Sequence, residues 1–296
     1  MTEFLSLDPL HKHLRKVFQH VSQWKGKLLV VKYGGAAMVN ESLKQSFAND
    51  IVFLRRSGVN VVVVHGGGKD ITVMADKLGI PTKFINGQRY TDKAMMDVVQ
   101  MVLAGKTNKD IVSDINRLSG NAIGLSGIDA SLLRAKKFND GKEDLGLVGE
   151  ITSVNSEFIH QLLHNGLLPV IAPIGVDDEG TVYNINADVA AAAIAREIQA
   201  DALLFLSDVP GISINDSLLQ QLTYEDASRY MHEGSISGGM IPKIESGFNA
   251  LDNGVDAVHF IDGREEHSIL RQLCSSISIG TGLSLSPERL MKLASA

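Results

Sequence analysis

Residues 27–35 read KLLVVKYGG, and residues 59–68 read VNVVVVHGGG. Each segment is a short run of aliphatic, mostly β-branched residues that ends in glycines, and the apolar residues of the intervening segment 43–56 recur at helical spacing. Apolar runs that are joined by helices are typical of parallel strands covered on both faces. These segments therefore predict an α/β protein with a mainly parallel central sheet.

The same alternation continues toward the C-terminal part of the chain. Together the elements predict a three-layer αβα sandwich in two lobes, residues 26–200 and 201–296, because an alanine-rich helix ends near Ala200 before a new strand begins. Further strands are expected at residues 167–172, 202–206 and 257–261, and helices at residues 92–103, 188–197 and 243–253.

The first 25 residues predict a separate amphipathic helix. Asp8 and Pro9 suit an N-cap followed by the first helical position, and apolar residues then recur every three or four positions from Leu10 to Trp24. This apolar face has to be buried, either on the helix's own domain or on another subunit. The sequence leaves both alternatives open.

Composition narrows the class of protein. The 296 residues include 28 Lys and Arg against 34 Asp and Glu, a formal net charge of −6, with 44% hydrophobic residues. This balance excludes a disordered chain and argues against nucleic-acid binding. The single cysteine, Cys274, excludes an internal disulfide and a zinc site built from several cysteines. With neither a signal peptide nor a membrane-spanning segment in evidence, we expect a cytoplasmic protein.

Glycine clusters follow the first two predicted strands, where a parallel sheet binds its ligands. Lys32 precedes Gly34 and Gly35, and His65 precedes Gly66 to Gly68. Backbone N–H groups in such loops can closely approach phosphate oxygens. Neither cluster is a Walker loop, and either one alone is more often a plain turn. Two such clusters at two strand ends, one with a lysine just ahead of it, narrow the odds between a plain turn and an anion site.

Two further segments carry polar groups. Residues 234–243 form a third glycine-rich stretch, which ends at Lys243 immediately before a helix. Asn184, Asn186 and Asp188 alternate along an extended segment, so their side chains share one side. Taken alone, Asn186 or Asp188 could be a simple N-cap.

Eight short segments follow one another between about residue 27 and about residue 281. They are Lys32-x-Gly-Gly35, His65-Gly-Gly-Gly68, Gly87-Gln-Arg-Tyr-Thr-Asp92, Leu103-Ala-Gly-Lys-x-Asn-Lys109, Leu145-Gly-x-Val-Gly149, Asn184-Ile-Asn-Ala-Asp188, Ser207-Asp-Val-Pro-Gly211 and Gly238-Gly-Met-Ile-Pro-Lys243. In their order and spacing these segments resemble the amino acid kinase family, and within it the acetylglutamate kinases. Each motif alone is weakly specific, whereas their ordered combination is highly specific.

The resemblance implies an enzyme that phosphorylates the side-chain carboxylate of N-acetyl-L-glutamate with ATP, giving an acyl phosphate, in the second step of arginine biosynthesis. It implies that residues 26–200 bind acetylglutamate and pair into a homodimer, and that residues 201–296 bind the nucleotide. The helix within residues 1–25 looks like the arm that joins three such dimers into a hexamer. The implied cofactor is Mg²⁺, which accompanies ATP.

The resemblance also implies roles for individual residues, carried over position by position. The implied catalytic residues are Lys32, Lys243 and Asp188. The implied substrate-binding residues are Gly67, Gly68, Arg89, Asn184 and Asn186. The implied nucleotide-binding residues are Gly34, Gly35, Ser207, Asp208, Gly211, Gly238, Gly239 and Lys243. No protein ligand of a metal ion is expected, because phosphate oxygens and water would hold the Mg²⁺.

These residue types suit the implied chemistry. A carboxylic acid with a pKa of about 4.3 is already ionised at neutral pH, so the acceptor needs no general base. The obstacle is the approach of one anion to another, which cations and N–H dipoles relieve. Two rival functions are a kinase of the same fold that acts on a longer or carrier-linked acetylated amino acid, such as an aminoadipate derivative, and a non-catalytic amino-acid sensor. The presence of both lysines, Asp188 and all three glycine loops weighs against the sensor.

Overall fold

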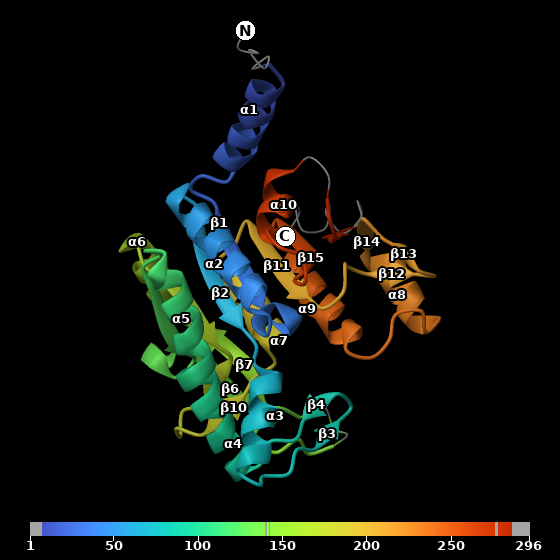
Figure 1. The fold of residues 1–296 in the computed structure, drawn as a ribbon. Coiled ribbons are helices and arrows are strands. Elements are labelled where there is room, and N and C mark those ends of the chain that lie inside the picture. Colours follow the sequence, from blue (N-terminus) through green and yellow to red (C-terminus); the bar gives the residue numbers. More distant parts are fainter. Residues whose placement is uncertain (1–7, 140, 142, 276–277, 286–296) are drawn as a thin grey trace.

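The computed structural model describes residues 8–139, 141, 143–275 and 278–285, and their side chains from residue 15 onward (Figure 1). Its centre is an eight-stranded sheet in which neighbouring strands are parallel except for one antiparallel pair, β15 and β16. The predicted mainly parallel sheet is therefore confirmed. The strand order is β14 (Gln221–Thr223), β16 (Thr281–Ser284), β15 (Ala257–Asp262), β11 (Ala202–Ser207), β1 (Leu28–Tyr33), β2 (Asn60–His65), β8 (Leu168–Ala172) and β5 (Ala122–Ser126).

Helices cover both faces of this sheet, so the three-layer sandwich is also confirmed. Successive strand residues point to opposite faces: Val30 and Val62 belong to one buried cluster, whereas Val31 and Val63 belong to the other. The first cluster includes side chains of α6 (Ser156–His164), α7 (Ala187–Glu197), α8 (Tyr224–His232) and α9 (Met240–Asp252). The second includes side chains of α2 (Glu41–Arg56), α5 (Asn108–Arg117) and α10 (Ser268–Cys274).

The helix expected at residues 92–103 is present, but its predicted end is wrong. An α-helix, α4 (Lys93–Gln100), continues into a π-helix, η2 (Met101–Thr107), and this leads directly into α5. A π-helix has i→i+5 hydrogen bonds and so adds a residue per turn. Apolar spacing does not reveal such a change of pitch, because the pattern read for a helix assumes 3.6 residues per turn.

Several short elements were not predicted. They include a second sheet, in the order β10-β9-β6-β7, and two hairpins, the first of which carries Arg89. Their strands are mostly two to six residues long and lack a clear apolar run. The elements are β6 (Leu133–Lys137), β7 (Gly149–Val154), β9 (Ile174–Val176), β10 (Val182–Asn184), β3 (Phe84–Ile85), β4 (Gln88–Arg89), β12 (Ser213–Ile214), β13 (Ser217–Leu218), α3 (Gly68–Lys77), η1 (Gly35–Met38) and η3 (Asp129–Ser131).

The N-terminal helix, α1 (Asp8–Gln23), extends away from the sandwich and contacts α10 (Figure 1). Its apolar face is only partly covered: Trp24, just after the helix, packs against the core and its indole N–H donates to Leu273 O at 3.2 Å, whereas Phe18 is 69% exposed. The side chains of Leu10 and Leu14, which the sequence placed on the same face, lie outside the described side chains. Among the described residues, no helix is both long enough and apolar enough to cross a lipid bilayer.

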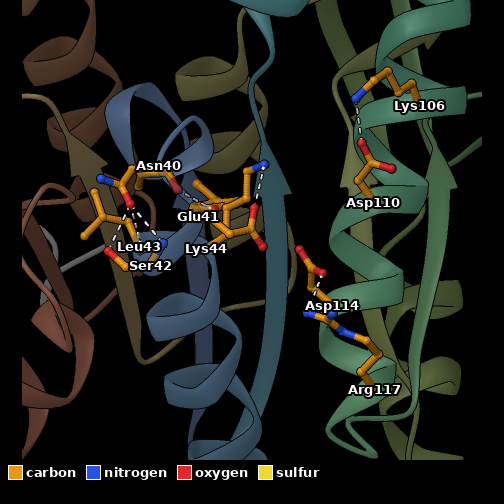
Figure 2. Close-up of polar contacts among 11 residues, drawn as sticks. Asn40, Glu41, Ser42, Leu43, Lys44, Lys106, Asp110, Asp114 and Arg117 are labelled. Carbon is orange, nitrogen blue, oxygen red and sulfur yellow. Dashed lines mark hydrogen bonds and ion pairs between the residues drawn. The ribbon is translucent and has the colours of Figure 1, made fainter.

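The start of α2 shows how local sequence fixes an element of the second face. Asn40 Oδ1 accepts hydrogen bonds from the Ser42 N–H at 2.9 Å and the Leu43 N–H at 3.4 Å, which is an N-cap (Figure 2). Nearby ion pairs on α2, η2 and α5 are exposed, and such pairs contribute little to stability. They are Glu41–Lys44, Lys106–Asp110 and Asp114–Arg117.

We expect the substitution Asn40→Ala to lower the free energy of unfolding by about 1 kcal/mol, because it leaves N–H groups of the first turn without their side-chain acceptor. Urea unfolding followed by circular dichroism measures this change. The control is Asn49→Ala, an exposed position in the middle of the same helix, where alanine favours the helix. Equal losses in the two variants would contradict the capping role.

Candidate active site

The loop after β1 packs tightly around two of the predicted site residues. A Cβ atom on Gly34 would lie 2.6 Å from Lys32 Nζ. Gly35 has a φ of +69°, and a Cβ atom there would lie 1.9 Å from Asp208 Oδ1. Asp208, which follows β11, accepts a hydrogen bond from the Ala36 N–H. At Gly35 a side chain would be strained and would collide with Asp208, whereas at Gly34 the tip of Lys32 would have to move. The structure thus brings Gly34, Gly35 and Asp208 together.

Asp188 joins two lysines that are far apart in the sequence. Lys32 lies near the end of β1, Asp188 in the first turn of α7 and Lys243 in the first turns of α9. Asp188 Oδ1 is 3.1 Å from Lys32 Nζ, and Asp188 Oδ2 is 2.7 Å from Lys243 Nζ. Lys32 and Asp188 are 7% and 8% exposed. All three predicted catalytic side chains therefore form one cluster, in which Lys32 and Asp188 are buried and Lys243 is half-buried.

The cluster holds its charges against the cost of burial. Burial alone would raise the pKa of Asp188, but the ammonium groups of Lys32 and Lys243 more than offset it, so that this pKa lies below its ordinary value. Burial and the neighbouring Lys32 lower the pKa of Lys243, and Asp188 opposes that change. The carboxylate is thus ionised at neutral pH and keeps two cations close together.

A cavity of about 190 Å³ lies beside this cluster, with Ala187 in its wall. All five predicted substrate-binding residues line it, although they come from the loop after β2, the β3–β4 hairpin and the segment before α7. These residues are Gly67, Gly68, Arg89, Asn184 and Asn186. The cavity presents one guanidinium, three amide side chains, including that of Gln88, and glycine backbone, which together suit a small anionic ligand.

Arg89 is held in this wall from several sides. Its Nη2 donates to Gly68 O at 2.8 Å and to Thr72 Oγ1 at 2.9 Å, and its guanidinium carbon lies 4.9 Å from the centre of the Phe84 ring. Thr82 Oγ1 accepts from Nη1 at 3.4 Å. The sequence did not identify either threonine as part of the site, because both stand outside the motifs that carry the resemblance.

The two asparagines are anchored differently. Asn184 Nδ2 donates to Thr91 Oγ1 at 3.1 Å, and Thr91 in turn donates to Arg89 O at 3.0 Å. Asn186 is the N-cap of α7, where its Oδ1 accepts from the Asp188 N–H at 2.8 Å. The capping role that the sequence left open for Asn186 is therefore present, and the residue also lines the cavity. Thr91 was missed, although it lies within a quoted motif.

The remaining nucleotide-site candidates divide into two kinds. Ser207 is buried and its hydroxyl donates to Val209 O at 3.0 Å, and Gly211 faces Thr281, whose Oγ1 would lie 2.7 Å from an added Cβ. Both residues thus have close neighbours within the fold. Gly238 and Gly239 are exposed with open space around them, immediately before Lys243. Their backbone is free to meet a ligand.

Taken together, the site offers two ammonium groups, a carboxylate that holds them, and backbone N–H groups of the glycine loops that lead into α3 and η1. Preorganised donors of this kind stabilise negative charge that is being transferred. Within the part of the chain that the structure describes, no three His, Cys, Asp or Glu side chains gather in a way that could hold a metal ion. The arrangement therefore suits group transfer between two anions.

We expect the isosteric substitution Asp188→Asn to lower the free energy of unfolding by about 3 kcal/mol at pH 7, because the buried ammonium of Lys32 and the half-buried ammonium of Lys243 lose their counterion. The pKa of Asp188 is lower in the folded protein, so this carboxylate stabilises the fold above its unfolded pKa of about 3.9 and stops doing so as the pH falls through its folded pKa. The difference in the free energy of unfolding between Asp188→Asn and wild type should therefore become smaller at low pH.

Urea unfolding at a series of pH values measures this difference. The matched control is Asp110→Asn, which removes an exposed carboxylate paired with Lys106 at 2.7 Å and should cost well under about 1 kcal/mol. A difference between Asp188→Asn and wild type that did not change with pH would contradict the assignment.

Known proteins resemble this chain over most of its length. The sequence pattern described as the amino acid kinase family matches residues 27–262. The acetylglutamate kinase of Chlorobaculum parvum is 46% identical over 276 residues, 93% of this chain and 91% of that protein. The acetylglutamate kinase of Clostridioides difficile is 47% identical over 272 residues, 90% of this chain and 94% of that protein.

Among solved structures, the N-acetylglutamate synthase of Neisseria gonorrhoeae, in complex with coenzyme A and N-acetyl-glutamate, superposes with a TM-score of 0.82 at 24% identity. The match covers 93% of this chain but 63% of that one, so this chain spans less than two thirds of the synthase. At this identity the likeness shows a common fold. The sequence match over most of the chain, and the relatives that share nearly half of its residues, place the protein in the amino acid kinase family.

Proposed function

We propose that this protein transfers the γ-phosphoryl group of ATP to the side-chain carboxylate of N-acetyl-L-glutamate, which gives an acyl phosphate in the second step of arginine biosynthesis. The observation that carries the proposal is the buried Lys32–Asp188–Lys243 cluster beside a cavity that contains Arg89. The relatives named acetylglutamate kinase supply the identity of the acceptor.

In this mechanism the acceptor carboxylate attacks the γ-phosphorus, and ADP leaves with the bridging oxygen. The acceptor is already ionised, so no side chain has to remove a proton. Lys32 stabilises the charge on the transferring group, and Lys243 stabilises the charge on the leaving side. Asp188 orients both ammonium groups, since each of its oxygens faces one of them.

Substrate binding follows from the walls of the cavity. Arg89 pairs with the α-carboxylate, for which a planar guanidinium is well suited, and Gly67 and Gly68 bind the reacting carboxylate through backbone N–H groups. Asn184 and Asn186 hold the acetamido group. Residues 26–200 thus form the acetylglutamate lobe and residues 201–296 the nucleotide lobe. The phosphates and nucleotide contact Gly34, Gly35, Ser207, Asp208, Gly211, Gly238, Gly239 and Lys243.

A kinase of this kind uses ATP with a divalent metal ion, for which we propose Mg²⁺. Mg²⁺ neutralises β- and γ-phosphate charge and retains several waters when phosphates bind it. The carboxylates near the nucleotide side of the site already have partners in the protein. Asp188 is paired with two lysines, and Asp208 accepts a backbone N–H. Phosphate oxygens and water would therefore hold the ion, with few or no protein carboxylates.

We expect Lys32→Met to lower kcat by about 10²- to 10³-fold, because one positioned donor to the transition state is lost. The measurement is an ATP-dependent hydroxamate assay with N-acetylglutamate and Mg²⁺, in which hydroxylamine traps the acyl phosphate. The control is Lys27→Met. Lys27 lies just before the same strand and pairs with Asp201, outside the cluster. Its removal should leave kcat within about twofold of wild type.

Full activity of Lys32→Met would remove this lysine from its proposed role. The same assay with N-acetylaminoadipate separates the proposed acceptor from a longer one: we expect a higher kcat/KM for N-acetylglutamate. A wild-type protein that binds N-acetylglutamate but forms no hydroxamate would instead be a sensor.

We also propose that residues 26–200 pair into a homodimer and that α1 joins three dimers into a hexamer. The exposed Phe18 on a helix that extends away from the sandwich (Figure 1) supports this proposal, because an apolar face of a helix needs a partner.

We expect Phe18→Asp, or deletion of residues 1–23, to reduce the assembly to dimers in light scattering after size exclusion. A single assembly size shared by these variants and wild type would reject the role of the arm.

A further inference from the structure

Behind the loop Gly66 to Gly68 lie two polar side chains with no assigned role. His65 is the last residue of β2, Asn108 is the first residue of α5, and both are 0% exposed. His65 Nδ1 is 2.7 Å from Gly66 O, and His65 Nε2 is 3.1 Å from Asn108 Nδ2. A buried polar pair of this kind persists only when its hydrogen bonds are satisfied.

The contacts of Asn108 decide which ring nitrogen carries the proton. Lys109 Nζ is 3.1 Å from Asn108 Oδ1, so that oxygen accepts and the amide nitrogen points the other way. The nitrogen has two hydrogens, and its two nearest acceptors are Val170 O at 2.9 Å and His65 Nε2 at 3.1 Å, with Leu125 O more distant at 3.4 Å. Because a donor faces Nε2, this atom holds a lone pair, and the ring proton is on Nδ1, where it donates to Gly66 O.

Burial keeps the imidazole neutral. It lowers the pKa of His65 to about 4, with Lys109 acting in the same direction and Asp70 in the opposite one. At neutral pH the ring is therefore an uncharged donor to one backbone carbonyl. It has no surface from which to exchange a proton with a substrate.

The carbonyl that His65 holds shares a peptide unit with the Gly67 N–H. The two groups of a planar trans peptide point in opposite directions, so fixing one fixes the other. The preceding peptide is also held, since the Gly66 N–H donates to Tyr33 O at 2.8 Å. Gly67, at a φ of +157°, packs so closely on Leu103 of η2 that an added Cβ would lie 2.5 Å from Leu103 Cδ2.

The absence of a side chain at Gly124 leaves room for the Asn108 amide. A Cβ atom on Gly124 of β5 would lie 1.9 Å from Asn108 Oδ1 and 2.8 Å from Lys109 Nζ. The π-helix η2 ends immediately before Asn108 and sets which way the first residue of α5 faces. Strand β5 and the end of η2 thus converge on one amide side chain.

From this geometry we infer that His65 and Asn108 are positioning residues for acceptor binding: the His65 Nδ1–H aims the Gly67 N–H at the acceptor carboxylate, and Asn108 keeps the imidazole in the tautomer that does so. The inference rests on the proposed function for the identity of the acceptor. It assigns His65 no proton transfer.

Two substitutions of His65 test the role of Nδ1. Asparagine places an amide N–H near the position of Nδ1, whereas glutamine places its amide near Nε2 and leaves Gly66 O without its donor. We expect His65→Gln to raise KM for N-acetylglutamate by about 10- to 100-fold, the usual cost of a weakened hydrogen bond to a charged group. KM for ATP should change much less, and His65→Asn should recover most of the loss. Equal losses in both variants, or equal changes in both KM values, would overturn the inference.

A second pair of variants separates positioning from stability. Asn108→Leu removes the contact with His65, and Asn116→Leu removes the contacts of Asn116 with the Ala122 backbone, at 2.9 and 2.6 Å, further along the same helix. Both should lower the melting temperature. We expect only Asn108→Leu to raise KM for N-acetylglutamate; a similar rise in Asn116→Leu would assign Asn108 a structural role alone.

The tautomer itself can be observed without any activity measurement. A long-range ¹H–¹⁵N NMR spectrum of histidine-labelled protein should show His65 protonated at Nδ1 only, unchanged between pH 6 and 8. An Nε2–H tautomer, or titration of His65 within this range, would overturn the inference. If wild type makes no hydroxamate while the spectrum shows the Nδ1–H form, the proposed function fails and the hydrogen-bond assignment stands.

Discussion

One buried carboxylate between two ammonium groups is the constraint on which the site depends. Two lysines whose tips share one carboxylate would repel each other without Asp188, and burial makes that repulsion stronger. The C-terminal end of strand β1 and the N-terminal ends of helices α7 and α9 therefore have to meet. The apolar packing of both helices against the same face of the sheet brings their ends there.

Backbone rather than side-chain chemistry makes up much of the remaining surface. Gly34, Gly35 and Gly67 stand where a Cβ atom would collide with Lys32, Asp208 and Leu103. Their absence of side chains lets charged groups and helix starts approach within hydrogen-bonding distance of a ligand. The structure thus combines a rigid charged cluster with loops whose amide groups are exposed toward it.

Much of this could be predicted from the sequence, for physical reasons. Strands β1, β2, β8, β11 and β15 are buried on both faces and appear as continuous apolar runs, so their observed limits lie within about one residue of those expected. The roles of the lysines, Asp188 and the cavity residues were implied by the resemblance of eight ordered segments to the amino acid kinase family, since no single motif is specific. The short antiparallel strands and η2 left no comparable pattern. Thr72, Thr82 and Thr91 support Arg89 and Asn184 through contacts that depend on the folded chain.

The pairing of β1 with β11 has a mechanical consequence. Residues 29–32 are hydrogen-bonded in register with residues 202–205, so the strands that precede Lys32 and Asp208 belong to one uninterrupted ladder. A hinge between the two halves of the sheet would have to break these backbone bonds. Any narrowing of the gap between donor and acceptor during a turnover must come from twisting of the whole sheet or from movement of loops. The paired strands keep the distance between their own ends constant.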